Sequence, residues 1–256
     1  PDGTVVVMNG EIYNHRQLRR LHTTYSFSTA GDTEAVLAVH RSAVTAHTTL
    51  TAREHASWLS NLDGMYAIAL WNPATQELIL ARDPMGIKPL VRTTVEDSLM
   101  FASEIKAFQA HEAHRPVLDD VAMAARLVWE YPLDGTTLLK GVQQVRPGTV
   151  ERWTLTDSGS PVLLDVANIE RQALAPSGSW NPDTQASALL ESFVEGVQQR
   201  LMADVPVGIV LSGGLDSSLV AAVAHEAAER AHQPVPECWT VAENEDNPDW
   251  KAAEVV

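Results

Sequence analysis

Cysteine is almost absent from this chain of 256 residues, because Cys238 is the only one. A lone cysteine excludes a disulfide within the chain and a metal site built from several thiolates. This scarcity is in keeping with a reducing compartment. The chain therefore depends on a packed core, for which a hydrophobic fraction of 45% is ample.

Basic residues are also scarce. The chain has 18 Lys and Arg against 33 Asp and Glu, which gives a formal net charge of −15. This excess of negative charge disfavours binding to nucleic acid and to anionic membranes. The chain also lacks an apolar run long enough to cross a bilayer and a charged-then-apolar leader. We therefore expect a cytoplasmic protein whose partners include neither nucleic acid nor membrane.

Residues 1–172 combine short β-rich segments with turn signals such as Asn-Pro and Asp-Pro-Met-Gly, which favours antiparallel pairing. Residues 14–21 and 32–44 are predicted helices. The predicted strands are residues 4–8, 65–71, 77–82, 90–93, 99–102 and 149–155.

Residues 173–183 contain two prolines and few apolar residues, and they are predicted to be a linker. Beyond it, a predicted helix at about 184–202 is followed by an apolar strand at 207–211, an alanine-rich helix and a strand at 237–241. This β-α-β order predicts a parallel sheet in residues 184–256.

The loop between that strand and helix reads SGGLDSS, from Ser212 to Ser218. Glycines let the backbone approach an anion, and the N-terminus of a helix attracts negative charge. The loop therefore suits phosphate. It lacks the Gly-Lys-Ser/Thr ending of the common P-loop, which indicates a different ATP chemistry.

Asn9-Gly10-Glu11 directly follows the first predicted strand. An asparagine amide and a glycine N–H placed there could stabilise an oxyanion, whereas a hairpin turn is the simpler interpretation. Asp32, after Ala30-Gly31, reads most simply as a helix N-cap. Arg82-Asp83 is interpreted as a tight turn fixed by an arginine–aspartate pair. Ser103 is interpreted as a helix cap, with a place in an interface between two sites as the alternative.

Taken together, these stretches resemble one family almost from end to end, the glutamine-dependent asparagine synthetases. The matching stretches occur in the family's order: NGEIYNHRQLR, GDTEAVL, LDGMYAIALW, ARDPMGIKPL, FASEIKAF, GVQQVRPGT, VPVGIVLSGGLDSS and DWKAAEVV. The resemblance implies an α+β N-terminal domain of the class II, N-terminal-nucleophile amidotransferase type, with antiparallel sheets sandwiched by helices. It implies that the start of an α/β parallel-sheet domain, like the adenine nucleotide alpha hydrolases, follows.

The resemblance assigns Asn9 and Gly10 to the oxyanion hole for glutamine hydrolysis, and Glu11 and Asp32 to the substrate's α-ammonium. The family's nucleophile, an N-terminal cysteine activated by its own amine, is absent from this chain. Cys238 lies in the other domain, has no free amine and is expected to be a small buried hydrophobe. The chain is therefore expected to be a piece of a longer protein, cut at both ends and inactive by itself.

For the second domain, the resemblance implies an ATP pyrophosphate motif. Its carboxylate, Asp216, is assigned to Mg²⁺, with a helix cap as the alternative. Two residues at strand ends, Leu211 and Val241, are assigned to the border of adenine, with ordinary core packing as the alternative. The residues of the motif are Ser212, Gly213, Gly214, Asp216, Ser217 and Ser218.

The implied activity is the ATP-dependent amidation of aspartate to asparagine, through a β-aspartyl-AMP intermediate, with ammonia from glutamine. The implied ligands are glutamine, aspartate, ATP and Mg²⁺, and a homodimer is left open. The alternatives are a β-lactam-forming synthetase, an amidotransferase that acts on a peptide or surface-sugar acid, and a non-catalytic homologue.

Overall fold

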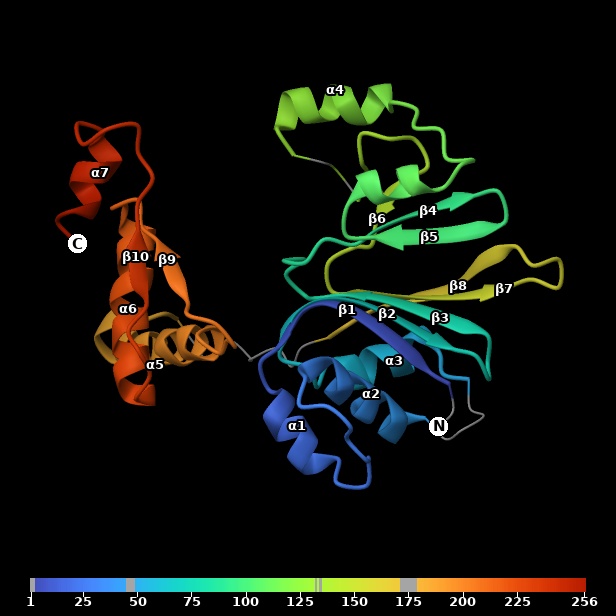
Figure 1. The fold of residues 1–256 in the computed structure, drawn as a ribbon, viewed down its shortest axis with the longest axis horizontal. Coiled ribbons are helices and arrows are strands. Elements are labelled where there is room, and N and C mark those ends of the chain that lie inside the picture. The colour runs from blue at the N-terminus through green and yellow to red at the C-terminus, as the bar shows by residue number, and fades with distance from the viewer. Residues whose placement is uncertain (1–2, 45–48, 132, 134, 171–178) are drawn as a thin grey trace. The chain divides into compact units, whose positions relative to one another are not determined.

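A computed structural model describes residues 3–44, 49–131, 133, 135–170 and 179–256 (Figure 1). The chain divides into two compact units, Pro1–Ala173 and Leu174–Val256. The predicted linker 173–183 lies partly outside the described residues, so its start stays a prediction, and a helix already begins at Pro182, before its predicted end.

The first unit contains helices and antiparallel strands, as the sequence predicts. Its elements are β1 (Val5–Ile12), α1 (His15–Leu21), α2 (Asp32–Ala43), α3 (Ala52–Leu59), β2 (Gly64–Asn72), β3 (Glu77–Arg82), β4 (Val91–Val95), β5 (Ser98–Ala102), η1 (Ile105–Ala110, a 3-10 helix), α4 (Asp120–Trp129), β6 (Gln143–Gln144), β7 (Thr149–Leu155) and β8 (Pro161–Asn168).

Two antiparallel sheets form the first unit. The larger has the strand order β1-β2-β3-β7-β8, and the smaller has the order β5-β4-β6. Helices α1, α2 and α3 lie on one side of the larger sheet and the smaller sheet lies on the other, with η1 and α4 beyond it (Figure 1). The prediction of an α+β domain with antiparallel sheets between helices is confirmed.

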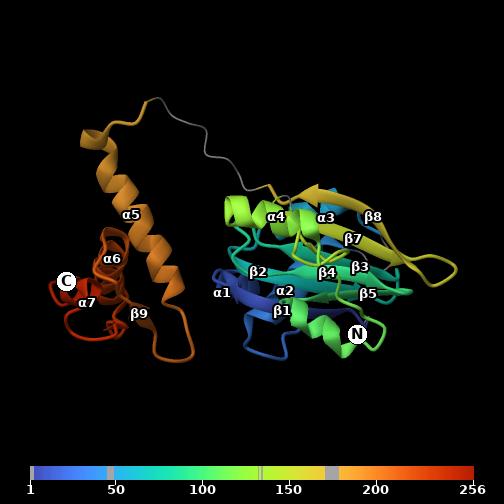
Figure 2. The same ribbon diagram turned by 90° about the horizontal axis from the view of Figure 1, so that it is seen from above.

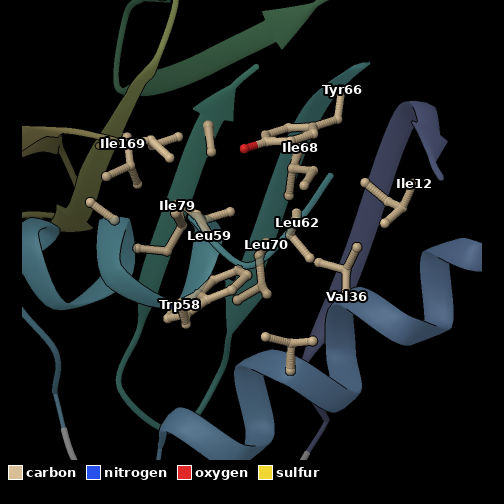
Figure 3. Close-up of a cluster of buried hydrophobic side chains, with 14 of the residues drawn as sticks. Ile12, Val36, Trp58, Leu59, Leu62, Tyr66, Ile68, Leu70, Ile79 and Ile169 are labelled. Carbon is tan, nitrogen blue, oxygen red and sulfur yellow. The ribbon is translucent and has the colours of Figure 1, made fainter. Parts of the chain in front are cut away.

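Strand β2 shows why some strands of this domain are continuous runs of apolar residues in the sequence. Tyr66, Ile68 and Leu70 belong to the core shared with α2 and α3 (Figure 3). Ala67 and Ala69, on the opposite face, belong to a second buried cluster on the side of the smaller sheet. Because both faces of the strand are covered, its residues are apolar without alternation.

The sequence predictions omit four elements of this unit, α3, α4, β6 and β8. A signal for α3 was present, because Thr51 and Glu54 form a capping box at its start. Strand β8 begins at Pro161 and is an edge of the larger sheet, where a missing N–H donor is tolerated. Helix α4 keeps Val121 and Leu127 each 80% exposed, so its apolar residues form no inward-facing pattern.

The second unit contains α5 (Pro182–Arg200), β9 (Gly208–Val210), α6 (Leu215–Ala231), β10 (Glu237–Trp239) and α7 (Pro248–Ala253). Strands β9 and β10 are parallel, which confirms the predicted β-α-β order. Helices α5 and α6 pack against each other (Figure 2) around a small core of Val194, Val223 and Ala227. None of the described helices is both long enough and apolar enough to span a membrane.

Candidate functional site

Asn9, Gly10 and Glu11 lie inside strand β1 rather than after it. They pair with Ala67, Tyr66 and Met65 of β2 in an unbroken antiparallel register. The interpretation of Asn9-Gly10 as a hairpin turn is therefore wrong. The strand continues through these polar residues to Ile12 because Val5, Val7 and Asn9 are exposed, so one face of this antiparallel strand need not be apolar.

Gly10 occupies a position that no other residue fits. A Cβ atom there would lie 2.1 Å from the carbonyl oxygen of Met65 and 2.7 Å from the Cα of Tyr66. Gly64 has the reciprocal problem, since its Cβ would lie 2.2 Å from the carbonyl oxygen of Glu11. The two strands thus approach each other closely where the candidate oxyanion donors are found.

The carboxamide of Asn9 forms a hydrogen bond with a residue that is distant in the sequence. Its Nδ2 donates to Ser103 Oγ at 2.9 Å, although the two residues are 94 positions apart in the chain. Ser103 does not cap a helix, because η1 begins after Glu104 and has no side-chain cap. The prediction of a Ser103 cap is wrong, and the hydroxyl instead contacts the candidate oxyanion residue.

Asp32 is the first residue of α2, and the N-cap is Gly31. The predicted N-cap role of Asp32 is therefore wrong. Its Oδ2 accepts a hydrogen bond from the backbone N–H of Ile12 at 2.9 Å. Ile12 directly follows Glu11, so this bond brings the start of α2 to the end of β1. The two carboxylates that the family resemblance assigns to an ammonium group, Glu11 and Asp32, thus come from adjoining backbone segments.

The loop that leads into Asp32 is held by Glu34 and Arg19. The carboxylate of Glu34 accepts four hydrogen bonds of 2.7–2.9 Å, from the N–H and O–H groups of Ser28 and Thr29. Burial alone raises the pKa of Glu34, but these bonds outweigh it and lower the pKa to about 2. Arg19 donates to the carbonyl oxygens of Thr29 and Gly31, and its guanidinium lies 4.0 Å from the Glu34 carboxylate.

Asp83 stabilises β2 at the position that pairs with Gly10. Asp83 is 1% exposed, and its carboxylate accepts from four backbone N–H groups at 2.9–3.3 Å. Three of these donors are in the loop 85–88, and the fourth is Tyr66, the partner of Gly10. Arg82 donates to the carbonyl oxygens of Gly86 and Lys88. The predicted tight turn is present, and both charges stabilise it through backbone groups.

In the second unit, the loop 212–218 joins β9 to α6 as predicted. The hydroxyl oxygens of Ser212 and Ser217 lie 3.0 Å apart, and the hydroxyl of Ser218 donates to Gly214 O at 2.7 Å. Gly213 has φ +74°, and a Cβ there would lie 2.4 Å from the carbonyl carbon of Ala252 in α7. Hydroxyls and N–H groups at the start of α6 are the donor types that phosphate oxygens need.

Asp216 lies in the first turn of α6, whose N-cap is Gly214, so the alternative of a capping aspartate is wrong. Its exposed carboxylate fits a magnesium ion that retains waters and takes its other ligands from phosphates. Within the described residues, no group of three or more His, Cys, Asp or Glu side chains could hold a metal by itself. The assignment of Asp216 to Mg²⁺ stays a prediction.

The two residues assigned to adenine differ in their surroundings. Leu211 is 5% exposed and its N–H donates to Trp239 O at 2.8 Å, so the core-packing alternative holds for it. Val241 is 89% exposed and lies beyond the end of β10, so core packing is wrong for this residue. Adenine contact stays a prediction for both.

Cys238 lies on β10 but is exposed, so the expectation of a buried thiol is wrong. All three residues of β10 are exposed in the described part of this unit, where the sheet has two strands. A cavity of about 730 Å³ is lined by segments 201–208 and 233–239. These segments lead into β9 and β10, so the cavity lies at the opposite end of the strands from the loop 212–218.

Comparison with known families agrees with the division of the chain into two units. Residues 2–160 match the model of the glutamine amidotransferase domain, and residues 188–256 match that of asparagine synthase. The first match covers more than half of the chain. The chain therefore belongs to the glutamine amidotransferase domain family.

Curated relatives cover both matched regions. The chain is 32% identical to asparagine synthetase (glutamine-hydrolyzing) 1 of Bacillus subtilis, over 86% of this chain and 32% of that protein. It is 35% identical to a putative asparagine synthetase (glutamine-hydrolyzing) of Mycobacterium tuberculosis H37Rv, over 88% and 33%. It is 32% identical to amidase chry2 of Gibberella zeae, over 86% and 30%. The chain thus spans about a third of the length of these relatives.

Among solved structures, a glutamine PRPP amidotransferase from B. subtilis, complexed with ADP and GMP, matches with a TM-score of 0.42 and 19% identity. The match covers 93% of this chain and 45% of that chain.

Proposed function

We propose that this chain is part of a glutamine-hydrolysing asparagine synthetase, with most of the glutaminase domain and the first β-α-β unit of the synthetase domain. The observation that carries the proposal is the meeting of Asn9, Gly10, Glu11 and Asp32 at the end of β1. These residues come from two segments that the Asp32–Ile12 hydrogen bond joins. The curated asparagine synthetases that match over most of the chain support it.

The four residues divide the work of glutamine hydrolysis. The Asn9 carboxamide and the Gly10 N–H would donate hydrogen bonds to the oxygen that becomes negative in the tetrahedral intermediate. Glu11 and Asp32 would bind the α-ammonium of glutamine, since a cation that leaves water needs a charged partner. The attacking thiol is proposed to be an N-terminal cysteine of the whole protein.

The second unit would serve the activation of the acceptor. A carboxylate is a poor electrophile, so an oxygen of the aspartate side chain attacks the α-phosphorus of ATP and pyrophosphate leaves. Ammonia would then attack the acyl carbon. AMP would leave with the electron pair of the bond between that carbon and the bridging oxygen, and the attacking nitrogen would lose a proton to give the amide. The loop 212–218 would bind the departing pyrophosphate, and Asp216 would hold the magnesium ion that accompanies it.

A second candidate differs only in the acceptor acid. The similarity to amidase chry2 and to amidase chyE of Penicillium rubens favours it, because these relatives are named amidases rather than asparagine synthetases. In this case the glutaminase residues keep their roles and another carboxylic acid is amidated.

The test is to incubate the full-length protein with glutamine, Mg-ATP and aspartate and to measure glutamate, asparagine, AMP and pyrophosphate. Formation of all four supports the first proposal. Glutamate formation that is never accompanied by asparagine, but is accompanied by AMP when other acids are supplied, favours the second candidate. A protein that releases no glutamate from glutamine would contradict both.

A further inference from the structure

The role proposed for Asn9 requires its side chain to present the correct end. A carboxamide has an N–H₂ group that donates and a carbonyl oxygen that accepts, and the two ends have nearly the same shape. The torsion that exchanges them is broad and weakly restricted. Asn9 is also exposed on an edge strand, so its orientation depends on specific contacts rather than on packing.

The hydrogen bond with Ser103 supplies such a contact. Asn9 Nδ2 donates to Ser103 Oγ at 2.9 Å, a normal length for an N–H···O bond. One of the two N–H bonds of the amide is used in this way. The second N–H remains available to a ligand, whereas a flipped amide would present its carbonyl oxygen to the developing negative charge.

We propose that Ser103 is a positioning residue for glutamine hydrolysis, which fixes the Asn9 carboxamide so that its free N–H points to the substrate's carbonyl oxygen. The inference rests on the proposed glutaminase function of Asn9. Ser103 itself does not touch the reacting atoms in this scheme. Its effect on the reaction passes through the orientation of one amide.

The backbone on both sides of Ser103 is anchored. Ala102, just before it, pairs with Val91 in the smaller sheet. Ile105, two residues later, starts η1 and packs with Ala102 against the cluster that contains Phe108, which is 1% exposed. The backbone that carries the Ser103 hydroxyl is therefore held between two packed segments, with Oγ placed to accept from Asn9 Nδ2. The hydroxyl also joins the smaller sheet to the edge strand of the larger one.

The experiment uses the full-length protein and four variants: Ser103→Ala, Ser103→Thr, Asn9→Ala and the double variant S103A/N9A. Ser98→Ala, at an exposed serine of β5, is the matched control. We expect Ser103→Ala to lower kcat for glutamine hydrolysis about tenfold, with KM for glutamine within about twofold of wild type. This loss is a fraction of the roughly 10²–10³-fold effect of a whole oxyanion donor. Ser103→Thr, which keeps the hydroxyl, should restore most of kcat, and Ser98→Ala should match wild type.

Two further readouts separate positioning from a general structural effect. Synthesis from added ammonium salt should be unchanged in Ser103→Ala, because it bypasses the glutaminase site. In the Asn9→Ala background, Ser103→Ala should change kcat less than about twofold, because no amide remains to be oriented.

Several results would overturn the inference while leaving the proposed function intact. These are wild-type kcat in Ser103→Ala, an equal loss in Ser103→Thr, a loss of ammonia-dependent synthesis, or a full tenfold loss in the Asn9→Ala background. A wild-type protein that does not hydrolyse glutamine would overturn the inference together with the proposed function.

Discussion

The two units hold their candidate sites in opposite ways. At the end of β1, Asn9 is bonded to a residue 94 positions away, and the N–H of Ile12 to one 20 positions away. In the loop 212–218, the side-chain hydrogen bonds of Ser212, Ser217 and Ser218 join residues of the loop to one another. The first site is therefore assembled by the tertiary fold, whereas the second is formed by one strand-to-helix connection. Substitutions can test whether the two sites are as independent as this difference implies.

The largest expected effect is on the second site. In the full-length protein, Asp216→Ala should abolish ATP-dependent amide formation, because the proposed magnesium ion loses its only protein carboxylate in the loop. Glutamine hydrolysis should persist, since the residues proposed for that reaction belong to the first unit. Parallel assays of AMP and glutamate release measure the two activities. Equal loss of both would mean that the sites are coupled or that the substitution unfolds the protein.

Asn9→Ala should show the converse pattern. Removal of one oxyanion donor should lower glutaminase turnover by roughly 10²–10³-fold, and synthesis from added ammonium salt should continue. Steady-state assays with glutamine and with ammonium chloride make the comparison. A loss smaller than about tenfold would argue against an oxyanion role for this carboxamide.

The contrast between the sites also explains what the sequence could predict. The strand, loop and helix around residues 212–218 were predictable because the glycines and hydroxyls that shape the loop are close together in the sequence. The predicted roles of Asp32 and Ser103 as helix caps were wrong because their partners, Ile12 and Asn9, are distant in the sequence. Local patterns favour caps for both residue types, and only the fold reveals the longer bonds.

Asp83 offers a test of how strongly the fold supports the first site. Asp83→Asn keeps the size of the side chain but replaces one acceptor oxygen by an N–H₂ group, which would face buried backbone N–H donors. We expect the free energy of unfolding of the first unit to fall by about 4 kcal/mol. Chemical denaturation followed by tryptophan fluorescence measures it, with Asp157→Asn, at an exposed aspartate in the β7–β8 turn, as the control. Equal stability of the two variants would contradict the proposed stabilisation of the first unit by the Asp83 carboxylate.

The smallest expected effect is a loss of stability at low pH, and we expect it in the first unit but not in the second. His55 is 3% exposed, and its Nδ1 accepts a hydrogen bond from the indole N–H of Trp58 at 3.1 Å. Burial, with a smaller contribution from the neighbouring His40, lowers the pKa of His55 from 6.5 to about 4. The histidines in the described part of the second unit are His225 and His232, and both are exposed, so this part has no buried histidine like His55.

Because the pKa of His55 is lower in the folded state, the unfolded chain binds more protons between pH 6.5 and 4. The stabilising contribution of neutral His55 is thus complete above pH 6.5 and is lost progressively as the pH falls to about 4, by at most about 3 kcal/mol. Hydrogen exchange at several pH values should show the first unit weakening over this range while the second does not. His55→Gln, which keeps an acceptor for the indole, should remove this dependence. The same slope in the variant and the wild-type chain would assign the pH effect to other groups, because glutamine has no proton to gain in this range.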